Sequence, residues 1–230
     1  MSAKKTAASP MAIPAEGFRF LAMLEKNNNK AWFDEHRADY QQHLLDPLKI
    51  MVMALGPKLE KKIPGLKYDP RVNGSIFRIN RDTRFSKDKR PYKTNAGVFF
   101  WAGGAEKMAC PGVYIHLEAK RAMMGAGIYM IAPEHMDRYR KFVASSGARL
   151  AKAVAKAGAH GFEIAGESLK RVPSGYPQDH KYGDYLKMKG FWVHKEYPSE
   201  RLTHGDLPQW IAGEITPAID VVKVLVRALF

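Results

Sequence analysis

The hydrophobic pattern of this 230-residue chain changes period twice, and that change limits the folds open to it. Before about residue 75 the apolar side chains recur every three to four positions, as on the buried face of a helix. Between 75 and 131 they alternate, most clearly where Val113, Ile115 and Leu117 share one side of a strand. From Pro133 the helical period returns. Strands gathered in the middle of a chain, with helices before and after them, predict an α+β domain.

Single elements can be placed from the same pattern. The connections between the second, third and fourth expected strands are short and contain glycine or polar residues, which predicts an antiparallel meander. Helices would cover one face of this sheet and leave the other partly open. Asn29 is expected to cap a helix, and Asp46 before Pro47 to begin a further one. The expected strands are 75–80, 96–101, 113–120, 122–131 and 191–197, and the expected later helices are 133–143, 149–157 and a closing pair over 210–226.

Length and cysteine content bound the organisation of the chain. A domain of this size can bury roughly 70–75% of its unfolded surface, and no internal linker is visible. We therefore expect one domain over 15–230, preceded by a disordered tail over 1–14. Cys110 is the only cysteine, which favours a reducing compartment, and no apolar run approaches the ~20 residues that span a bilayer. We expect a cytoplasmic protein without a membrane span; the acid-poor start leaves organelle targeting as the weaker alternative.

The segment 78–93, RINRDTRFSKDKRPYK, has a net charge of +5 within a chain whose net charge is +14. It forms most of a fifteen-residue connection between two expected strands, and structureless loops of that length are uncommon unless they are functional. Arginine presents a planar fork of donors to phosphate, and lysine a point charge. We expect an anion-binding site in which Asp82 and Asp88 orient the cations and Tyr92 packs beside the ligand. The expected contacts are Arg78, Arg81, Arg84, Lys87, Lys89 and Lys93. The alternative is a surface network of ion pairs with little energetic worth.

A second basic segment, LKRVP at 169–173, adds Lys170 and Arg171 to the expected binding residues if the two loops meet in space. The alternative is a proline-stiffened surface connection. His180 follows in the same loop and can move protons near neutral pH.

His116 and Glu118 lie with Tyr114 on the expected open face of a strand. Two metal ligands without a third make a weak site, so we expect a hydrogen-bonded pair, with no metal and no cofactor. Together with His180, these two residues are the candidates for a general base. Gly125 and Gly127 share one face of the next strand, where a packed aromatic ring or a bulge is favoured over a ligand.

Three functions are compatible with these features. The favoured hypothesis is binding of a phosphate-bearing or otherwise polyanionic ligand, either a phosphorylated small molecule or nucleic acid. The alternatives are an enzyme acting on a phosphorylated or nucleotide substrate, and a scaffold whose basic loop contacts a protein partner. The chain lacks the common phosphate-loop, dinucleotide, zinc-protease and serine-hydrolase motifs, so none of those classes is favoured.

The run RDTRFSKDK at 81–89, followed by PYKT at 91–94, resembles the signature of a family found in bacteria and fungi and known as a conserved domain of unknown function. Other pieces are similar in the same order, from Asn27-Asn28 with Trp32-Phe33 through the strand of Gly125 and Gly127 to 169–173 and 184–189. The resemblance covers nearly the whole chain from about Gly17. It implies that the two basic segments are shared features of the family, and it implies no particular activity.

Overall fold

A six-stranded antiparallel sheet with the order β1-β2-β3-β4-β6-β5 lies at the centre of the computed structural model, which describes residues 11–230. This arrangement confirms the α+β class, and β2, β3 and β4 form the predicted meander. The strands are β1 (Leu66–Lys67), β2 (Asn95–Ala102), β3 (Gly112–Glu118), β4 (Arg121–Ile128), β5 (Glu163–Ala165) and β6 (Phe191–Pro198).

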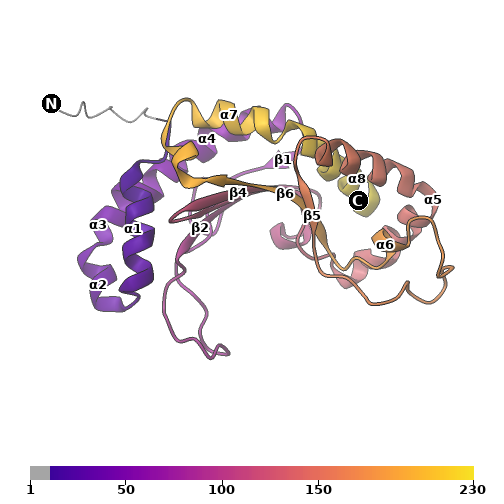
Figure 1. Ribbon diagram of the computed structural model, residues 1–230, viewed down its shortest axis with the longest axis horizontal. Helices are drawn as coiled ribbons and strands as arrows, with labels where there is room; N and C mark the ends of the chain where they lie inside the picture. The colour runs from indigo at the N-terminus through magenta and orange to yellow at the C-terminus, as the bar shows by residue number, and fades with distance from the viewer. Residues whose placement is uncertain (1–10) are drawn as a thin grey trace.

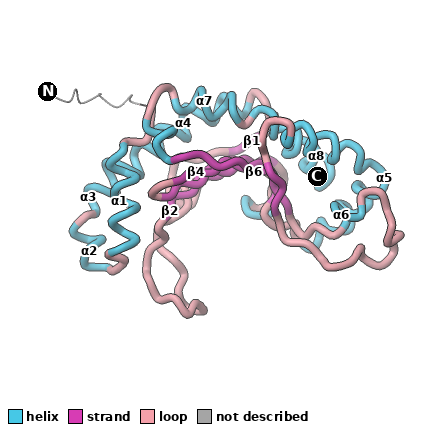
Figure 2. The backbone as a smooth tube through the Cα atoms, in the orientation of Figure 1, coloured by secondary structure: helices cyan, strands magenta, loops and turns pink. Residues whose placement is uncertain are grey.

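Helices precede and follow the strands in sequence and leave one face of the sheet uncovered (Figure 1). In this view α1 to α3 lie at one end, α5, α6 and α8 lie at the other, and α4 and α7 lie above the sheet. Figure 2 shows a long loop hanging from the uncovered side. The helices are α1 (Ala15–Lys26), α2 (Lys30–Glu35), α3 (Arg37–Tyr40), α4 (Asp46–Glu60), α5 (Pro133–Gly158), α6 (Gly183–Leu186), α7 (Leu207–Glu214) and α8 (Ile219–Leu229).

The core lies between the helices and the covered face of the sheet. Alternate residues of β2 and β3 point into it, so that Val98, Phe100 and Ile115 are fully buried. On α8 the apolar stripe of Val222 and Leu225 is fully buried as well. Because these positions have the strand and helix periods read from the sequence, the sequence alone was enough to place them.

A side-chain cap begins α2 as expected, whereas α4 begins at the predicted residue without a side-chain cap. The side-chain Oδ1 of Asn29 accepts a hydrogen bond from the backbone N–H of Trp32 at 3.0 Å, which confirms the predicted cap of α2. Asp46 begins α4 with Pro47 in its first turn, directly after a π-helical turn over Gln41–Leu45. The backbone is already helical at Leu45, so Pro47 lies at the junction between the π-helical turn and α4.

The expected strand at 75–80 was wrong, because its two halves pair with different segments. Ile76 forms a single bridge to Val98 of β2, and the N–H of Phe77 donates to the carbonyl of Gly97 at 3.0 Å. The second half then leaves β2 and pairs with 91–93, where Arg81 N–H donates to the Pro91 carbonyl at 2.8 Å. This switch of partner closes the base of the long loop.

Two further differences concern helix α5 and the N-terminus. The expected helices 133–143 and 149–157 are one element, α5, with a kink at Ser146 where φ is −135°. Most of the expected tail, residues 1–10, lies outside the described residues. Within its remainder Ile13 is fully buried, and its N–H donates to the Leu202 carbonyl at 3.1 Å.

Candidate functional site

Glycines and large side chains share the uncovered face of the sheet. The pairing register brings them into rows, and in each row a glycine lies beside an aromatic or imidazole ring. Such a face is low where the glycines lie and high where the rings stand. Read across β2, β3, β4 and β6, the rows are Gly97–His116–Met123–Glu196, Phe99–Tyr114–Gly125–His194 and Trp101–Gly112–Gly127–Trp192.

These glycines are required because the neighbouring rings lie over them. A Cβ at Gly97 would lie 2.5 Å from the Tyr114 hydroxyl oxygen, and one at Gly112 would lie 2.6 Å from the Phe99 ring. Gly127 adopts a φ of +153°, which side chains disfavour, and a Cβ there would lie 2.8 Å from Cβ of Trp192. The nearest atoms to that Cβ are the Phe191 carbonyl oxygen and Cα of Trp192, so β6 approaches Gly127 closely, whereas the Trp192 ring would lie 3.5 Å from a Cβ at Gly125.

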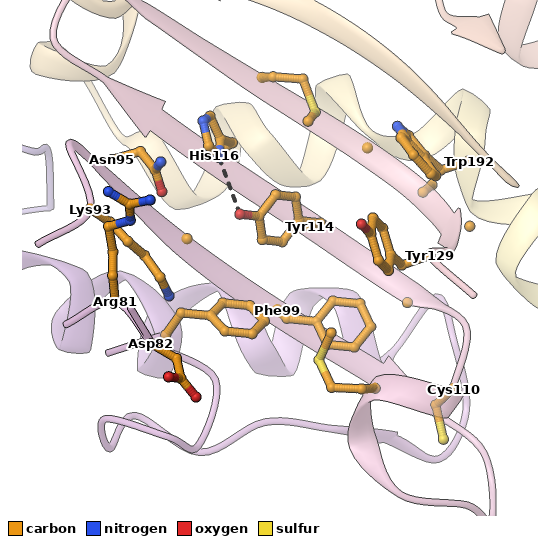
Figure 3. A pocket seen from close by; sticks show the side chains of 18 residues that line it. Arg81, Asp82, Lys93, Asn95, Phe99, Cys110, Tyr114, His116, Tyr129 and Trp192 are labelled. Carbon is orange, nitrogen blue, oxygen red and sulfur yellow. Dashed lines mark hydrogen bonds between the residues drawn. The ribbon is translucent and has the colours of Figure 1, made fainter. Parts of the chain in front are cut away.

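The rings and glycines enclose a cavity of about 710 Å³, drawn in Figure 3. This volume falls in the range of roughly 300–1,000 Å³ that is typical of small-molecule sites. One wall is a stacked pair, since the rings of Tyr129 and Trp192 have centroids 5.7 Å apart and an interplanar angle of 27°. Tyr129 is nevertheless 68% exposed, so its outer face is free to contact a ligand. The other aromatic rings of the lining are Phe77, Phe99 and Tyr114.

Cations of the basic loop lie at one end of the same cavity, where Figure 3 shows Arg81 and Lys93 near Asn95. The guanidinium of Arg81 donates from Nη1 to Oδ2 of Asp88 at 2.7 Å and to a backbone carbonyl at 3.3 Å. The ammonium of Lys93 donates to the carbonyl of Arg78 at 3.0 Å, and burial, followed by the charge of Arg78, lowers its pKa. An arginine has five N–H donors and a lysine three, so both keep donors for a ligand.

The other charged residues of the basic loop lie away from this cavity, with the exception of Asp82, which lines it. Arg84 pairs with Asp82 and Arg90 with Asp88, each at 2.7 Å between guanidinium and carboxylate. Hydrogen bonds from Arg84 lower the pKa of Asp82, and those from Arg90, followed by Arg81, lower the pKa of Asp88. Each aspartate thus pairs with an arginine two residues further along the loop. The exposed cations Arg78, Lys87 and Lys89 do not line the cavity.

Tyr92 has a structural place in the loop. Its side chain is only 6% exposed and stacks on Phe33, with ring centroids 4.1 Å apart. It does not line the cavity, so it packs in the core and not beside a ligand. Its backbone is held by Asn28, whose side chain donates to the Tyr92 carbonyl and accepts from its N–H, both at 3.0 Å. The base of the loop is therefore fixed to the N-terminal helices.

The second basic segment lies elsewhere. Lys170 and Arg171 are exposed in the loop that follows β5, whereas the first basic loop precedes β2, near the opposite edge of the sheet. Figure 1 shows the two loops apart. His180 accepts a hydrogen bond from the N–H of Tyr182 at 3.0 Å and helps to shape a turn. None of these three candidates borders the cavity, so the structure does not bring them to the first site.

His116 and Glu118 form a hydrogen-bonded pair, as expected, and the structure extends it at both ends. Nε2 of His116 lies 2.9 Å from Oε1 of Glu118, and Nδ1 lies 3.1 Å from the hydroxyl of Tyr114. Arg121 donates to Glu118 at 2.6 Å and is the main cause of the lowered pKa of that carboxyl. Burial, with a smaller contribution from Glu118, raises the pKa of Tyr114 to about 12.

Sequence reasoning had not placed Tyr114 in a site, although the alternation Tyr-x-His-x-Glu at 114–118 was a signal that the three share one strand face. Tyr114 and His116 line the cavity, as Figure 3 shows. Cys110 lines it too; burial raises the pKa of its thiol, which is unlike a reactive cysteine. Within residues 11–230 no three His, Cys, Asp or Glu side chains group closely enough to hold a metal ion.

The fold and the site together define an α+β protein with a ligand-sized cavity on an open antiparallel sheet. The chain belongs to the family described as conserved hypothetical protein (DUF2461), which it matches over residues 16–223. A solved structure, the crystal structure of an uncharacterized protein from Methanothermobacter thermautotrophicus, is similar at a TM-score of 0.34 and 9% sequence identity. The similarity covers 77% of this chain and 96% of that one. No curated protein matches the chain.

In the described part of the chain, no helix combines the length and the apolar character needed to cross a membrane.

Proposed function

We propose that the cavity binds a small anionic ligand that carries a flat ring, such as a phosphorylated nucleoside. The observation that carries this proposal is the polarity of one cavity, which has Arg81 and Lys93 at one end and the Tyr129–Trp192 stack at the other. A phosphate would bind the two cations, and the ring would lie on the glycine floor against the aromatic wall. Base–aromatic stacking contributes roughly 1–3 kcal/mol, and charge-assisted hydrogen bonds are the stronger polar contacts.

The carboxylate at the rim does not oppose this ligand strongly. Asp82 lines the cavity, but two guanidinium nitrogens of Arg84 bond its carboxylate at 3.0 and 2.7 Å. Asp88, in turn, is shared between Arg81 and Arg90. An incoming phosphate would therefore contact cations that hydrogen bonds already hold in place. It would also neutralise the charge of the partly buried Lys93, which no carboxylate neutralises within the described chain.

Matched charged and neutral probes test the proposal by calorimetry. AMP is compared with adenosine, and naphthalenesulfonate with naphthalenemethanol, on the full chain. We expect each anion to bind more tightly than its neutral partner, and Arg81→Gln or Lys93→Gln to weaken the anions by about tenfold or more. Lys87→Gln is the matched control, because Lys87 is in the same loop and does not line the cavity. Equal affinity for charged and neutral probes would refute an anion site.

Single-stranded nucleic acid is an extended ligand of the same class. It is distinguished from a compact ligand by the salt dependence of its affinity and by the effect of the control variant Lys87→Gln. A polyanion that crosses the whole loop would contact the exposed cations, so Lys87→Gln and Lys89→Gln would weaken it as much as Arg81→Gln does. Its affinity would also fall steeply with salt, because bound cations displace counterions. A compact ligand would respond to Arg81 and Lys93 alone.

Enzymatic action on such a ligand is a second candidate, favoured by the chain of hydrogen bonds from Tyr114 to Glu118. The cations would stabilise developing negative charge, and His116 would exchange a proton with the ligand through the Tyr114 hydroxyl. The expected result is a pH-dependent turnover of a phosphorylated nucleoside that disappears in a folded His116→Gln variant. If the protein were instead a scaffold for a protein partner, neither the cavity variants nor the small-molecule probes would change the binding of that partner.

A further inference from the structure

The three residues Tyr114, His116 and Glu118 form a hydrogen-bonded chain whose direction can be worked out from donors and acceptors. Glu118 is paired with Arg121 at 2.6 Å, which keeps it an ionised carboxylate that only accepts hydrogen bonds. Nε2 of His116, 2.9 Å away, must therefore carry the hydrogen. In a neutral imidazole the other nitrogen, Nδ1, is then an acceptor. The Tyr114 hydroxyl, 3.1 Å from Nδ1, consequently donates its proton to the histidine.

In this neutral form Tyr114 offers the cavity only the lone pairs of its oxygen, which suit a donor and repel an oxyanion. Protonation of His116 reverses the last bond, because an imidazolium donates from both nitrogens. The Tyr114 oxygen then accepts from Nδ1–H, and its own hydroxyl hydrogen is released toward the cavity. One proton on His116 thus adds a positive charge and a hydrogen-bond donor to a wall of the site.

We propose that His116 takes up a proton when the cavity binds an oxyanion, and that Tyr114 then donates a hydrogen bond to that ligand. This inference rests on the proposed function, since it concerns the same cavity and ligand class. The proton comes from solvent and stays on the imidazole between Tyr114 and Glu118. The affinity for the oxyanion is therefore higher at lower pH. It falls by up to tenfold per pH unit once the imidazole of the ligand-free protein is neutral.

Several residues surround the imidazole of His116 in the hydrogen-bonded chain. Directly opposite it, β2 presents Gly97 and β4 presents Met123, neither of which titrates. The carboxylate of Glu118 lies on one side of the imidazole and the cations Arg81 and Lys93 share the cavity with it, and a bound anion would offset the charge of those cations. The other charged groups near the cavity or the chain are Arg81, Asp82 and Lys93 at the rim, and Arg121 and Glu196 beyond Glu118.

Calorimetry with naphthalenesulfonate tests the proton uptake, because a sulfonate keeps one charge across the range in which histidine titrates. Titrations in two buffers of different ionisation enthalpy measure the protons taken up per ligand bound. We expect uptake of up to about one proton in the wild type and none in His116→Gln. A wild type that binds the sulfonate without uptake overturns the proposal, and so does uptake that persists in His116→Gln.

Tyr114→Phe tests the reversal of the hydroxyl, because a purely structural role of Tyr114 would not make the loss of affinity depend on pH. Loss of the hydroxyl should weaken the sulfonate by about tenfold near pH 6, where it donates to the ligand, and little near pH 8, where it donates to His116. An equal loss at both values would overturn the reversal of the hydroxyl. Thermal unfolding of each variant confirms that it is folded before affinities are compared.

Nitrogen NMR of the histidines in the ligand-free protein separates this inference from the proposed function. We expect neutral His116 to carry its hydrogen on Nε2, with this preference lost in Glu118→Gln and kept in the control Glu196→Gln, which also removes a partner of Arg121. Hydrogen on Nδ1 would overturn the direction of the chain whatever the ligand. If the sulfonate and AMP both fail to bind, the proposed function and the linked uptake fail together, and the NMR result alone decides the direction.

Discussion

Asn28 and Tyr92 are 64 residues apart in sequence and exchange two hydrogen bonds of 3.0 Å, one in each direction. The side-chain amide of Asn28 thereby pairs with the backbone of Tyr92 as a neighbouring strand would. Arg81 and Lys93, the two cations at the rim of the cavity, lie on either side of Tyr92 where the loop closes on itself. This pairing therefore connects the N-terminal helices to the cation end of the candidate site.

Asn28→Ala should destabilise the protein by about 1–3 kcal/mol, because it leaves the N–H and carbonyl of a buried residue without their partners. It should also weaken anionic probes, since the backbone that carries Lys93 is no longer fixed. Urea unfolding and calorimetry measure the two effects. Asn80→Ala is the control: Asn80 is exposed at the same loop base. Equal losses in both variants would contradict the role of Asn28.

Gly97→Ala should displace the Tyr114 ring, because the added Cβ would lie 2.5 Å from the phenolic oxygen. We expect a loss of about 1–3 kcal/mol in the free energy of unfolding, as for other overpacked sites. Combining it with Tyr114→Phe removes the clashing oxygen, so the double variant should lose less than the sum of the two. An additive double-mutant cycle would show that the clash is relieved elsewhere.

A glycine in open space supplies the matched control for that substitution. Gly213 lies within α7, and a Cβ added there would have no neighbouring atom within 4 Å. Gly213→Ala should therefore leave stability unchanged or raise it by about 0.5–1 kcal/mol through helix propensity. Destabilisation by both alanines would mean that the Gly97 result is not specific to Tyr114.

Asp88 should stabilise the loop at neutral pH and lose that effect in acid. Its pKa is lowered by hydrogen bonds from Arg90 and Arg81, so the folded state favours the ionised form. A lowered carboxyl pKa contributes stability that is present above the ordinary range of aspartate and is lost as pH falls toward the folded pKa. The difference in unfolding free energy between wild type and Asp88→Asn should be constant above about pH 5 and shrink below it.

Asp137→Asn is the control for the acid series. Asp137 pairs with Lys141 on the surface of α5, and its side chain is 75% exposed. Its replacement should change stability little at any pH, because exposed ion pairs contribute roughly 0–1 kcal/mol. If the Asp88→Asn gap stayed constant down to strong acid, the loop ion pairs would make no pH-dependent contribution.

Phe85 and Phe33 should respond oppositely to truncation. Phe85 lies within the basic loop and is 96% exposed, so Phe85→Ser should change the free energy of unfolding by no more than about 0.5 kcal/mol. Phe33 is 4% exposed and stacks on Tyr92, so Phe33→Ala should cost about 3–5 kcal/mol. Urea unfolding of the two variants makes the comparison. A large cost at Phe85 would place that ring in a packed environment.

Local chemistry explains what could be predicted from the sequence. The alternation in β3 and the cap at Asn29 depend on residues within a few positions of each other, and both were correct. The 75–80 segment failed because its second half pairs with 91–93, and no local pattern reports that choice of partner. The class of fold survived this error because it depends on the order of several elements.

The residues of the candidate site also depend on pairing between distant segments, which local patterns do not report. Arg81 and Arg84 are three residues apart and equally basic, yet Arg81 lines the cavity and Arg84 does not. The difference arises from the pairing of 79–81 with 91–93, which the composition of the loop does not encode. The glycine floor was missed at Gly97 and Gly112 because it depends on the register between strands, which sets the ring that each glycine faces.

The sheet ends on both sides in very short strands, β1 with two residues and β5 with three. Each therefore presents few unpaired backbone groups to another chain, although the uncovered face between them carries the half-buried rings of Phe99, Tyr114 and Trp192. Longer edge strands would promote strand addition and fibrous association between copies of the chain. Short edge strands are compatible with an uncovered apolar face, because they leave little edge on which a larger sheet could grow.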